Sequence, residues 1–185
     1  MSKKKVLFVN GHLNVGGVER SLIDLLRHFD YSKYEVDLLL LEDLGDYSDE
    51  LPQEVNVIFH NISCAYGPFG KMLLQNIRRG RFTDILFRIV LNGSRRLGKS
   101  FLRTLSSLLP VKNSYDYAIA YRTGICEDIV AYAVKCKKKY LWWHNGECNY
   151  SSWQIAQANK TWMLFDCVVT VSEGCKKMLE ATFSL

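Results

Sequence analysis

The 185-residue sequence predicts an α/β fold with a doubly wound, mostly parallel sheet of the Rossmann-like type. Three observations support this fold class. Short apolar runs of strand length alternate with amphipathic runs of helix length along most of the chain. The apolar runs lack polar alternation, which indicates strands covered by helices on both faces. The first apolar run leads through a glycine-containing loop directly into a helix, an order with which α/β sheets build anion sites.

The first strand is expected at 6–9, followed by Gly11, Gly16, Gly17 and an amphipathic helix that starts near Val18. Glycines let the backbone approach a ligand, and a helix N-terminus offers unpaired N–H groups at the positive end of its dipole. This loop is therefore the first candidate for binding a phosphate or a sugar phosphate.

The later elements follow from the same patterns. The other predicted strands are 36–41, 55–59, 115–121, 139–143 and 166–171. The other predicted helices are 127–134, Ser151 or Ser152 to about Leu164, and Glu173 to about Thr182 with Ser172 as its N-cap. Ligands of such sheets bind beyond the carboxyl ends of the strands. The candidate binding loops are therefore 10–17, 121–124, 144–149 and 172–174.

Basic residues are concentrated in the segment 64–110, which is expected to be a helical insert. It holds nine basic residues against Asp84 alone, a net charge of +8, whereas the whole chain has +5. Apolar residues from Phe82 onward recur with helical spacing, and two helices are expected with a break near Asn92-Gly93 or Gly98. One interpretation is a helical cover for one sheet edge with a solvated arginine face. The other is a patch for an anionic membrane surface, formed by Arg78, Arg79, Arg81, Arg88, Arg95, Arg96 and Lys99.

Composition and residue patterns argue against several functional classes. No known module or aromatic interleaving accompanies the basic residues, so no nucleic-acid partner is expected. The six cysteines form no Cys-x-x-Cys pair and no zinc-type Cys/His cluster, so we expect no metal and no cofactor. Cys126 and Cys167 are interpreted as reduced, buried cysteines. No apolar run approaches the roughly 20 residues of a membrane span, and none near the N-terminus suits a signal peptide. We expect a cytoplasmic protein, with peripheral association at the inner face of the membrane as the alternative.

Four pieces of sequence, in order, resemble the N-terminal, acceptor-side domain of a family 4 retaining glycosyltransferase of the two-domain GT-B architecture. They are the segments 6–20 with Gly16-Gly17-Val-Glu-Arg20, 115–121, 140–145 with His144-Asn145, and 165–173. The likeness spans most of the chain except the basic insert. It implies one Rossmann-like domain over 1–185, half of a GT-B architecture. It also implies that the C-terminal donor-binding domain is absent from this chain, so the chain alone should be inactive.

The resemblance implies transfer of a hexose from a nucleoside-diphosphate sugar to a saccharide or lipid-linked acceptor, with retained configuration, in glycan or polysaccharide biosynthesis. His144, at the end of a buried strand, is the predicted catalytic residue, because imidazole can donate to a sugar hydroxyl or a departing phosphate. A structural histidine is the alternative. The predicted substrate-binding residues are His12, Asn14, Gly16, Gly17, Arg20, Arg122, Asn145, Glu147 and Ser172.

Simpler interpretations of several of these residues stay open. Gly16 and Gly17 could serve a tight turn that needs positive φ, and Ser172 could be only an N-cap. Arg20 and Arg122 could be ordinary surface arginines. Asn145 stands where many members of the family carry Asp, so no carboxylate role is assigned to it.

Two other classes also stay open. An NAD(P)-binding oxidoreductase is favoured by Glu42, which ends the second strand roughly where a ribose-binding acid falls, although Leu13 stands where the second glycine of that motif belongs. A noncatalytic membrane-associated module would need the basic insert and would not depend on His144.

Overall fold

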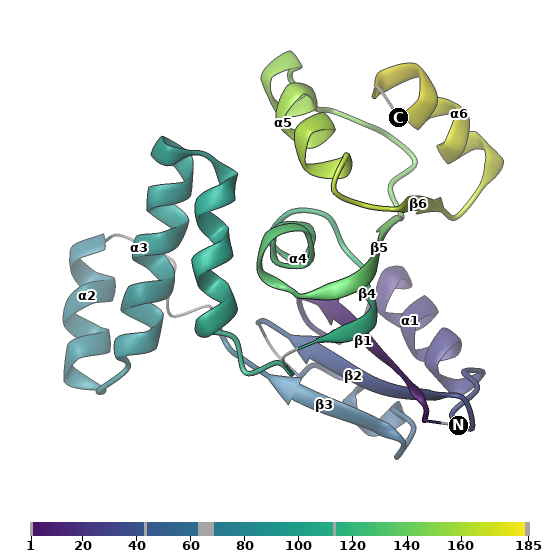
Figure 1. Cartoon of the computed structure of the whole chain (residues 1–185), viewed down its shortest axis with the longest axis horizontal. Coiled ribbons are helices and arrows are strands. Elements are labelled where there is room, and N and C mark those ends of the chain that lie inside the picture. The colour runs from purple at the N-terminus through teal and green to yellow at the C-terminus, as the bar shows by residue number, and fades with distance from the viewer. Residues whose placement is uncertain (1, 43, 63–68, 113, 184–185) are drawn as a thin grey trace.

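A computed structural model of the chain describes residues 2–42, 44–62, 69–112 and 114–183. Within them, six parallel strands form one sheet in the order β3-β2-β1-β4-β5-β6 (Figure 1). The predicted doubly wound α/β class is therefore confirmed. The strands are β1 (Lys4–Asn10), β2 (Tyr34–Leu40), β3 (Val55–Phe59), β4 (Tyr115–Ala120), β5 (Cys136–Trp143) and β6 (Cys167–Thr170).

The order of the strands reverses between β1 and β4. The chain adds β2 and β3 on one side of β1, then crosses back and adds β4, β5 and β6 on the other. The loops that leave β1 and β4 therefore diverge to opposite sides. In open α/β sheets the crevice at such a switch point is the usual ligand site.

Strand residues alternate between two apolar clusters. Leu7 and Val9 belong to the cluster beneath the insert and the C-terminal helices, whereas Val6 and Phe8 pack beneath α1 (Gly17–Arg27). Side chains at successive strand positions point to opposite faces, so a doubly covered sheet needs apolar residues at every position. This requirement explains why the strands show no polar alternation.

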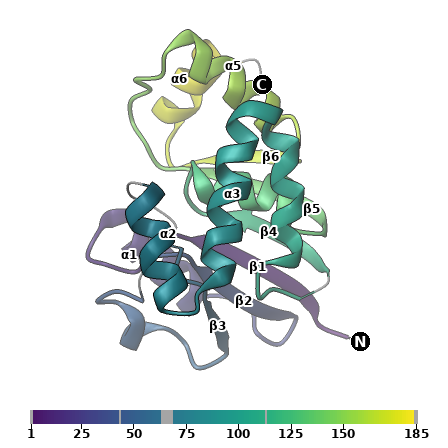
Figure 2. The same cartoon turned by 90° about the vertical axis from the view of Figure 1, so that its left-hand side faces the viewer.

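The insert consists of α2 (Phe69–Arg78), α3 (Phe82–Leu97) and the 3-10 segment η3 (Lys99–Ser107), which stand in front of the sheet in Figure 2. The predicted break at Gly98 is confirmed: Gly98 has φ 93°, a left-handed conformation that favours glycine. The alternative break at Asn92-Gly93 is wrong, because α3 runs through it. Residues 64–68 of the predicted insert lie outside the described residues.

The other helices lie close to their predicted bounds. The predicted 127–134 helix begins earlier, as α4 (Ile125–Asp128), and continues as the π segment η4 (Ile129–Ala133). Ser151 caps α5 (Ser152–Trp162), and its hydroxyl accepts from the Gln154 amide. The Ser172 hydroxyl accepts from the Cys175 amide at the start of α6 (Glu173–Thr182), which confirms the N-cap. A short 3-10 turn, η1 (Ser48–Glu50), precedes β3.

The cysteines differ in exposure. Cys126 is buried as expected, but the expectation for Cys167 is wrong because it is exposed at the start of β6, the edge strand of the sheet. Among the described residues, no helix is long and apolar enough to span a membrane.

Candidate functional site

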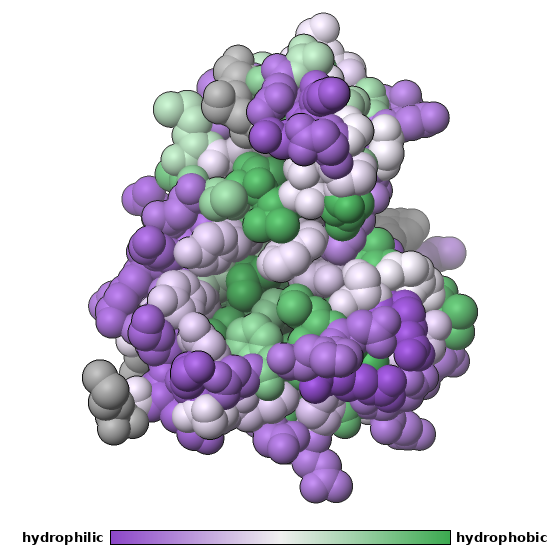
Figure 3. All heavy atoms as spheres, turned by 90° about the vertical axis from the view of Figure 1, so that its right-hand side faces the viewer, coloured by the Kyte–Doolittle hydropathy of each residue, from purple (hydrophilic) through white to green (hydrophobic). Residues whose placement is uncertain are grey.

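Two of the four predicted binding loops, 121–124 and 144–149, line one pocket at the carboxyl edge of the sheet. The switch-point pocket has a volume of about 240 Å³ and lies beside the start of α1 and the ends of β4 and β5. It brings together three predicted site residues from two loops, Arg122, His144 and Asn145. The face of the molecule that carries α1 and β5 shows apolar residues in a hollow between two polar regions (Figure 3). The pocket is lined by Val18, Arg122, Thr123, Trp142, His144 and Asn145.

A buried carboxylate, Glu19, lies at the first turn of α1 and joins two loops. Its Oε1 atom is 3.1 Å from Arg122 Nη2 and 3.8 Å from His12 Nδ1, and its side chain is 2% exposed. Arg122 Nη1 lies 3.2 Å from His12 Nε2. The carboxylate thus holds the loop after β1 against the loop after β4, at the switch point itself.

His12 supports its own loop as well. The Asn14 N–H donates to His12 Nδ1 at 3.3 Å, and the Asn10 side-chain amide donates to the His12 carbonyl at 2.7 Å. A neutral imidazole has one lone pair, so the ring can accept from either Asn14 or Arg122 but not from both at once. His12 and Asn14 therefore shape the loop rather than line the pocket.

The two glycines of this loop have different reasons for being glycine. A Cβ on Gly16 would lie 2.3 Å from Glu19 Oε2, whereas a Cβ on Gly17 would meet no atom within 4 Å. Neither residue has positive φ, so the tight-turn interpretation is wrong. A side chain at Gly16 would therefore force the buried carboxylate of Glu19 to move. Nothing in the described chain requires Gly17, which leaves the first turn of α1 open to an approaching group.

His144 directly follows β5, and one of its ring nitrogens has no hydrogen bond to the described residues. Its ring centroid is 4.8 Å from that of Tyr121, and burial lowers the pKa of His144 although Glu19 and the Tyr121 backbone oppose the shift. Nε2 is buried and has no hydrogen-bond partner among the described residues, so the bond to the Tyr121 backbone involves Nδ1. The ring is therefore neutral near pH 7 with Nδ1–H donating, and Nε2 presents a lone pair.

Three buried polar atoms at this edge lack hydrogen bonds to the described residues: Asn10 Oδ1, Glu19 Oε1 and His144 Nε2. Glu19 Oε1 is close to Arg122, but outside hydrogen-bond geometry. An unsatisfied buried polar group costs about 1–3 kcal/mol, so native proteins retain few of them without a reason. Glu19 Oε1 is ion-paired with Arg122, and of the three residues only His144 lines the pocket, so His144 Nε2 marks this pocket as the candidate binding site.

The loop after β2 braces the loop after β1. Tyr47 N–H donates to the Leu13 carbonyl at 2.9 Å, and Val15 N–H donates to an Asp46 carboxylate oxygen at 3.1 Å. Gly45 has φ 77°, and a Cβ on it would lie 2.2 Å from the Leu13 carbonyl carbon. The shape of the first binding loop therefore depends on a glycine from another loop.

Several predicted site residues do not line the switch-point pocket. Arg20 Nη1 lies 3.1 Å from Glu50 Oε2, and Arg20 Nη2 lies 3.3 Å from Asp24 Oδ1, on the outer side of α1. Glu147 is exposed on the loop after β5, and Ser172 caps α6. Glu42 lies beside Gly11, where a Cβ would be 3.4 Å from its Oε1.

The sequence patterns did not single out Glu19, Tyr121 or Thr123 as site residues. Glu19 carried a recognisable signal, because an acidic residue three positions after an N-cap is typical of helix starts. Trp142 and Trp143 point to opposite faces as expected. Trp143 is buried in the larger core, whereas Trp142 stacks on Tyr121 and lines the pocket.

The basic residues of the insert do not act as one patch. Lys99 Nζ is 2.6 Å from Asp128 Oδ1 and is 29% exposed, so the expectation that Lys99 faces a membrane is wrong. Arg81 pairs with the buried Asp84 at 2.6 Å. Arg78 and Arg79 are exposed, and the side chains of Arg95 and Arg96 lie outside the described residues.

No known family model and no curated protein sequence matches this chain. Among solved structures, TcCGT1 in complex with UDP overlaps 88% of this chain and 32% of its own, at 13% identity and a TM-score of 0.34. UGT2 of Phytolacca americana, complexed with UDP-2fluoro-glucose and pterostilbene, overlaps 78% of this chain and 31% of its own, at 12% identity and a TM-score of 0.33. The chain thus spans about a third of each structure. TM-scores this low carry no conclusion about function, which must come from the residues of this chain.

Proposed function

We propose that this chain is the acceptor-side domain of a retaining glycosyltransferase of the family 4 type. The reaction is transfer of a hexose from a nucleoside-diphosphate sugar to a saccharide or lipid-linked acceptor. A donor-binding domain outside this chain completes the site. The observation that supports the proposal best is the buried His144 Nε2, which has no hydrogen bond to the described residues and belongs to the lining of the switch-point pocket, near the open first turn of α1. The four resembling segments support it as well.

Each residue has a role that its geometry supports. The N–H groups of the first turn of α1 bind the diphosphate, and Gly17 leaves room for it. Arg122, anchored by Glu19, holds a negatively charged oxygen at the pocket rim. His144 accepts a hydrogen bond from a sugar hydroxyl through Nε2 and orients that hydroxyl. This replaces the predicted donor role, because burial lowers the pKa of His144 and the proton of the neutral ring lies on Nδ1, which bonds to the Tyr121 backbone.

Titration of the ¹⁵N-labelled chain with UDP-glucose and, separately, with NAD tests the proposal by NMR. We expect UDP-glucose to perturb the amides of Gly17, Val18 and Thr123. We expect Arg122→Ala to weaken the affinity for UDP-glucose about ten-fold, because a charge-assisted hydrogen bond contributes about 1.5–3 kcal/mol. Arg20→Ala is the matched control, since Arg20 is ion-paired on the same helix but lies outside the pocket. Tight binding of NAD with perturbation of Glu42 would replace the proposal with the oxidoreductase alternative.

His144 is tested separately with His28 as its control. We expect His144→Ala to weaken the binding of UDP-glucose or of an acceptor sugar. His28 lies at the exposed end of α1, so His28→Ala should leave the binding of both unchanged. If both histidine variants bind like the parent, His144 is only structural and the role assigned to it is incorrect.

A second candidate function, peripheral membrane binding, is favoured by one observation. Large apolar side chains on α2 and α3 are about half exposed or more, next to the exposed Arg78 and Arg79. An apolar face flanked by cations suits a surface of anionic lipid. The apolar residues are Leu74, Ile77, Phe82, Leu86 and Ile89.

Vesicle sedimentation tests this candidate. We expect binding to phosphatidylglycerol vesicles, weaker binding to phosphatidylcholine, and loss of both with Leu74→Ser combined with Phe82→Ser. Met163→Ser is the control, because Met163 is 81% exposed on α5's C-cap, away from the insert. Equal sedimentation of the parent and the double variant would exclude this surface.

A further inference from the structure

A second pocket lies at the amino edge of the sheet, at the opposite end of the strands from the switch-point pocket. It is formed where the neighbouring strands β1, β4 and β5 begin. Its volume is about 590 Å³, within the range of sites that hold small ligands. We call it the amino-edge pocket. Its charged and hydroxyl-bearing lining includes Lys3, Lys5, Ser114, Asp116, Lys135 and Lys137.

The lining of the amino-edge pocket is strongly basic. Four lysines and one carboxylate line it, which gives a net charge of +3. The lysines come from two distant parts of the chain, residues 3–5 and 135–137, and the parallel order of β1, β4 and β5 brings them to one edge. Positive charges around one concave surface reinforce each other's field and attract anions.

The carboxylate of the lining is already used. Asp116 Oδ1 lies 2.6 Å from Lys137 Nζ, and Asp116 Oδ2 accepts from the Lys5 backbone N–H at 2.8 Å. Within the described part of the chain, the ammonium groups of Lys3, Lys5 and Lys135 have no ion pair and no hydrogen bond. Three cations of this pocket are therefore unmatched.

Nearby lysines that serve the fold do have partners. Lys112 Nζ lies 3.3 Å from the buried Asp37 and also pairs with Glu35 at the start of β2. Lys4 Nζ donates to the Tyr117 hydroxyl at 3.1 Å. The unmatched lysines differ from these because they line a pocket, where a ligand can supply the missing negative charge.

The charge of the pocket indicates a ligand with more than one phosphate. A phosphate monoester carries about 1.5–2 negative charges at pH 7, so two such groups match the net charge of the lining. Lysines bind phosphate as point charges on flexible stems, and Ser114 adds a hydroxyl that can donate to the same anion. A ligand with a single carboxylate would leave cations unmatched.

We infer that the amino-edge pocket binds a compact polyanion with two or more phosphate groups, either free or as the headgroup of a lipid. Lys3, Lys5 and Lys135 hold the phosphates, and Asp116 holds Lys137 at the side of the pocket. The site is separate from the switch-point pocket and from the apolar face of the insert. It does not rest on the proposed function.

Calorimetric and NMR titrations with soluble inositol phosphates test the inference. Inositol trisphosphate, inositol monophosphate and inositol share one ring and differ in charge. We expect the trisphosphate to bind about ten-fold more tightly than the monophosphate, or better, and to lose affinity as salt screens the lysines. It should perturb the amides of Lys5, Ser114 and Lys137 but not that of Thr123 at the switch point. Equal affinities for the two phosphates, no binding of the trisphosphate, or perturbation of the switch point alone would overturn the inference.

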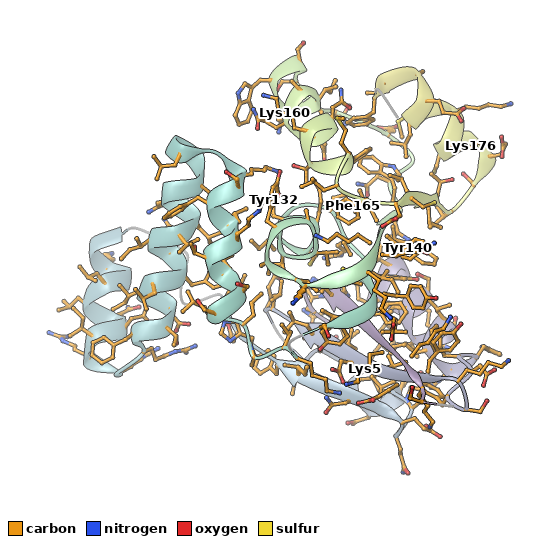
Figure 4. All side chains as sticks on the ribbon, in the orientation of Figure 1. Lys5, Tyr132, Tyr140, Lys160, Phe165 and Lys176 are labelled. Atoms are coloured by element: carbon orange, nitrogen blue, oxygen red, sulfur yellow. The ribbon has the colours of Figure 1, made fainter. Side chains whose placement is uncertain are left out.

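Matched double variants locate the site. We expect Lys5→Gln with Lys135→Gln to weaken trisphosphate binding about ten-fold, because two unmatched cations are removed. Lys176→Gln with Lys177→Gln is the control, since it changes the net charge equally at exposed lysines of α6. Figure 4 shows Lys176 across the molecule from Lys5. Equal losses in the two double variants would show attraction to the overall charge and would exclude the pocket.

Asp116→Asn gives a test of opposite sign, which a loss of folding cannot imitate. The variant removes the negative charge of the lining and releases Lys137, and its amide oxygen can still accept from the Lys5 N–H. We expect tighter binding of the trisphosphate than in the parent. Weaker binding in a folded Asp116→Asn variant would contradict the inference.

Vesicles distinguish the two sources of the phosphates. Phosphatidylinositol bisphosphate in phosphatidylcholine presents the headgroup on a membrane, and phosphatidylinositol is its control with a single phosphate. The chain carries Leu74→Ser and Phe82→Ser in this experiment, so that the apolar face of the insert does not contribute. Binding to the bisphosphate vesicles that exceeds binding of the soluble trisphosphate, and is lost with Lys5→Gln and Lys135→Gln, identifies a lipid headgroup. Equal or weaker vesicle binding identifies a free polyanion.

Discussion

Two clusters of buried charge lie on either side of the β4–α4 turn, and they are built differently. In the insert cluster, Lys99 Nζ bonds to Asp128 at 2.6 Å and to Thr161 Oγ1 at 3.2 Å. In the switch-point cluster, Glu19 Oε1 contacts Arg122 and His12 without reaching hydrogen-bond geometry. The insert cluster satisfies its charges and ties η3 to α4 and α5. The switch-point cluster holds two loops together beside a pocket on which the buried His144 Nε2 has no hydrogen bond to the described residues.

The insert cluster should matter more for stability. Figure 4 shows Tyr132 on the side of the α4–η4 segment that faces the insert, and its hydroxyl lies 3.4 Å from Thr161 Oγ1. Lys99→Met removes the cation from a carboxylate that is 19% exposed. We expect a loss of about 3 kcal/mol in the free energy of unfolding, measured by urea denaturation. The double variant Lys99→Met with Asp128→Leu should recover part of it; a loss below about 1 kcal/mol would mean that the pair is not effectively buried.

The same cluster should make stability depend on pH. Burial, with the neighbouring Asp128, raises the pKa of Glu127 to about 7, above its ordinary 4.5. The folded state then binds more protons between these values, so this contribution is complete below pH 4.5 and is lost as pH rises through 7. We expect Glu127 to favour folding at pH 5 over pH 8 by as much as about 3 kcal/mol.

The control for this pH effect is the difference between the parent chain and Glu127→Gln. Burial lowers the pKa of His144 and His60, which acts in the opposite direction below pH 6.5, so the parent curve alone is ambiguous. Parallel curves for the two proteins between pH 5 and pH 8 would contradict the prediction.

In the switch-point cluster, Gly16→Ala should disturb the carboxylate. The new Cβ would lie 2.3 Å from Glu19 Oε2, so Glu19 must move away from Arg122. We expect a loss of about 1–3 kcal/mol, measured by thermal or urea unfolding, as for other overpacked sites. An unchanged stability would show that Glu19 can move without cost.

Gly17→Ala, one residue later, should have the smallest effect and the opposite sign. Its Cβ meets no atom, its φ is not positive, and alanine restricts the unfolded chain, so we expect a gain of about 0.5 kcal/mol. If the first turn of α1 binds a diphosphate, the same variant should weaken the binding of UDP-glucose. Higher stability together with unchanged UDP-glucose binding would contradict the role of Gly17.

Local patterns predicted the sheet well because each strand contains a short apolar run, although β5 begins earlier than predicted, in the lysines 137–139. Residues 36–41, for example, contain one polar residue, Asp37, and correspond to β2. The same patterns located the carboxyl ends of the strands and therefore Arg122 and His144. They missed α2, whose apolar residues Leu73, Leu74 and Ile77 form a short stripe.

Contacts between distant residues could not be predicted in this way. Glu19 and Arg122 are about a hundred residues apart in sequence, and Lys99 and Asp128 are 29 apart. Helical spacing grouped Lys99 with the arginines of the insert, but it lies beyond the end of α3 at Gly98, and its ammonium group turns toward α4. Whether a charged residue is exposed, lines a binding site or is paired in the core depends on which distant residues the fold brings next to it.

Gly45 makes the first binding loop a part that cannot be transplanted alone. The loop keeps its shape because residues 45–47 pack on Leu13 and bond to it. A protein engineer who moved 10–17 into another α/β scaffold would need to move 42–47 with it. For the same reason, a loss of ligand binding in a Gly45 variant would arise without any change to a residue that lines the pocket.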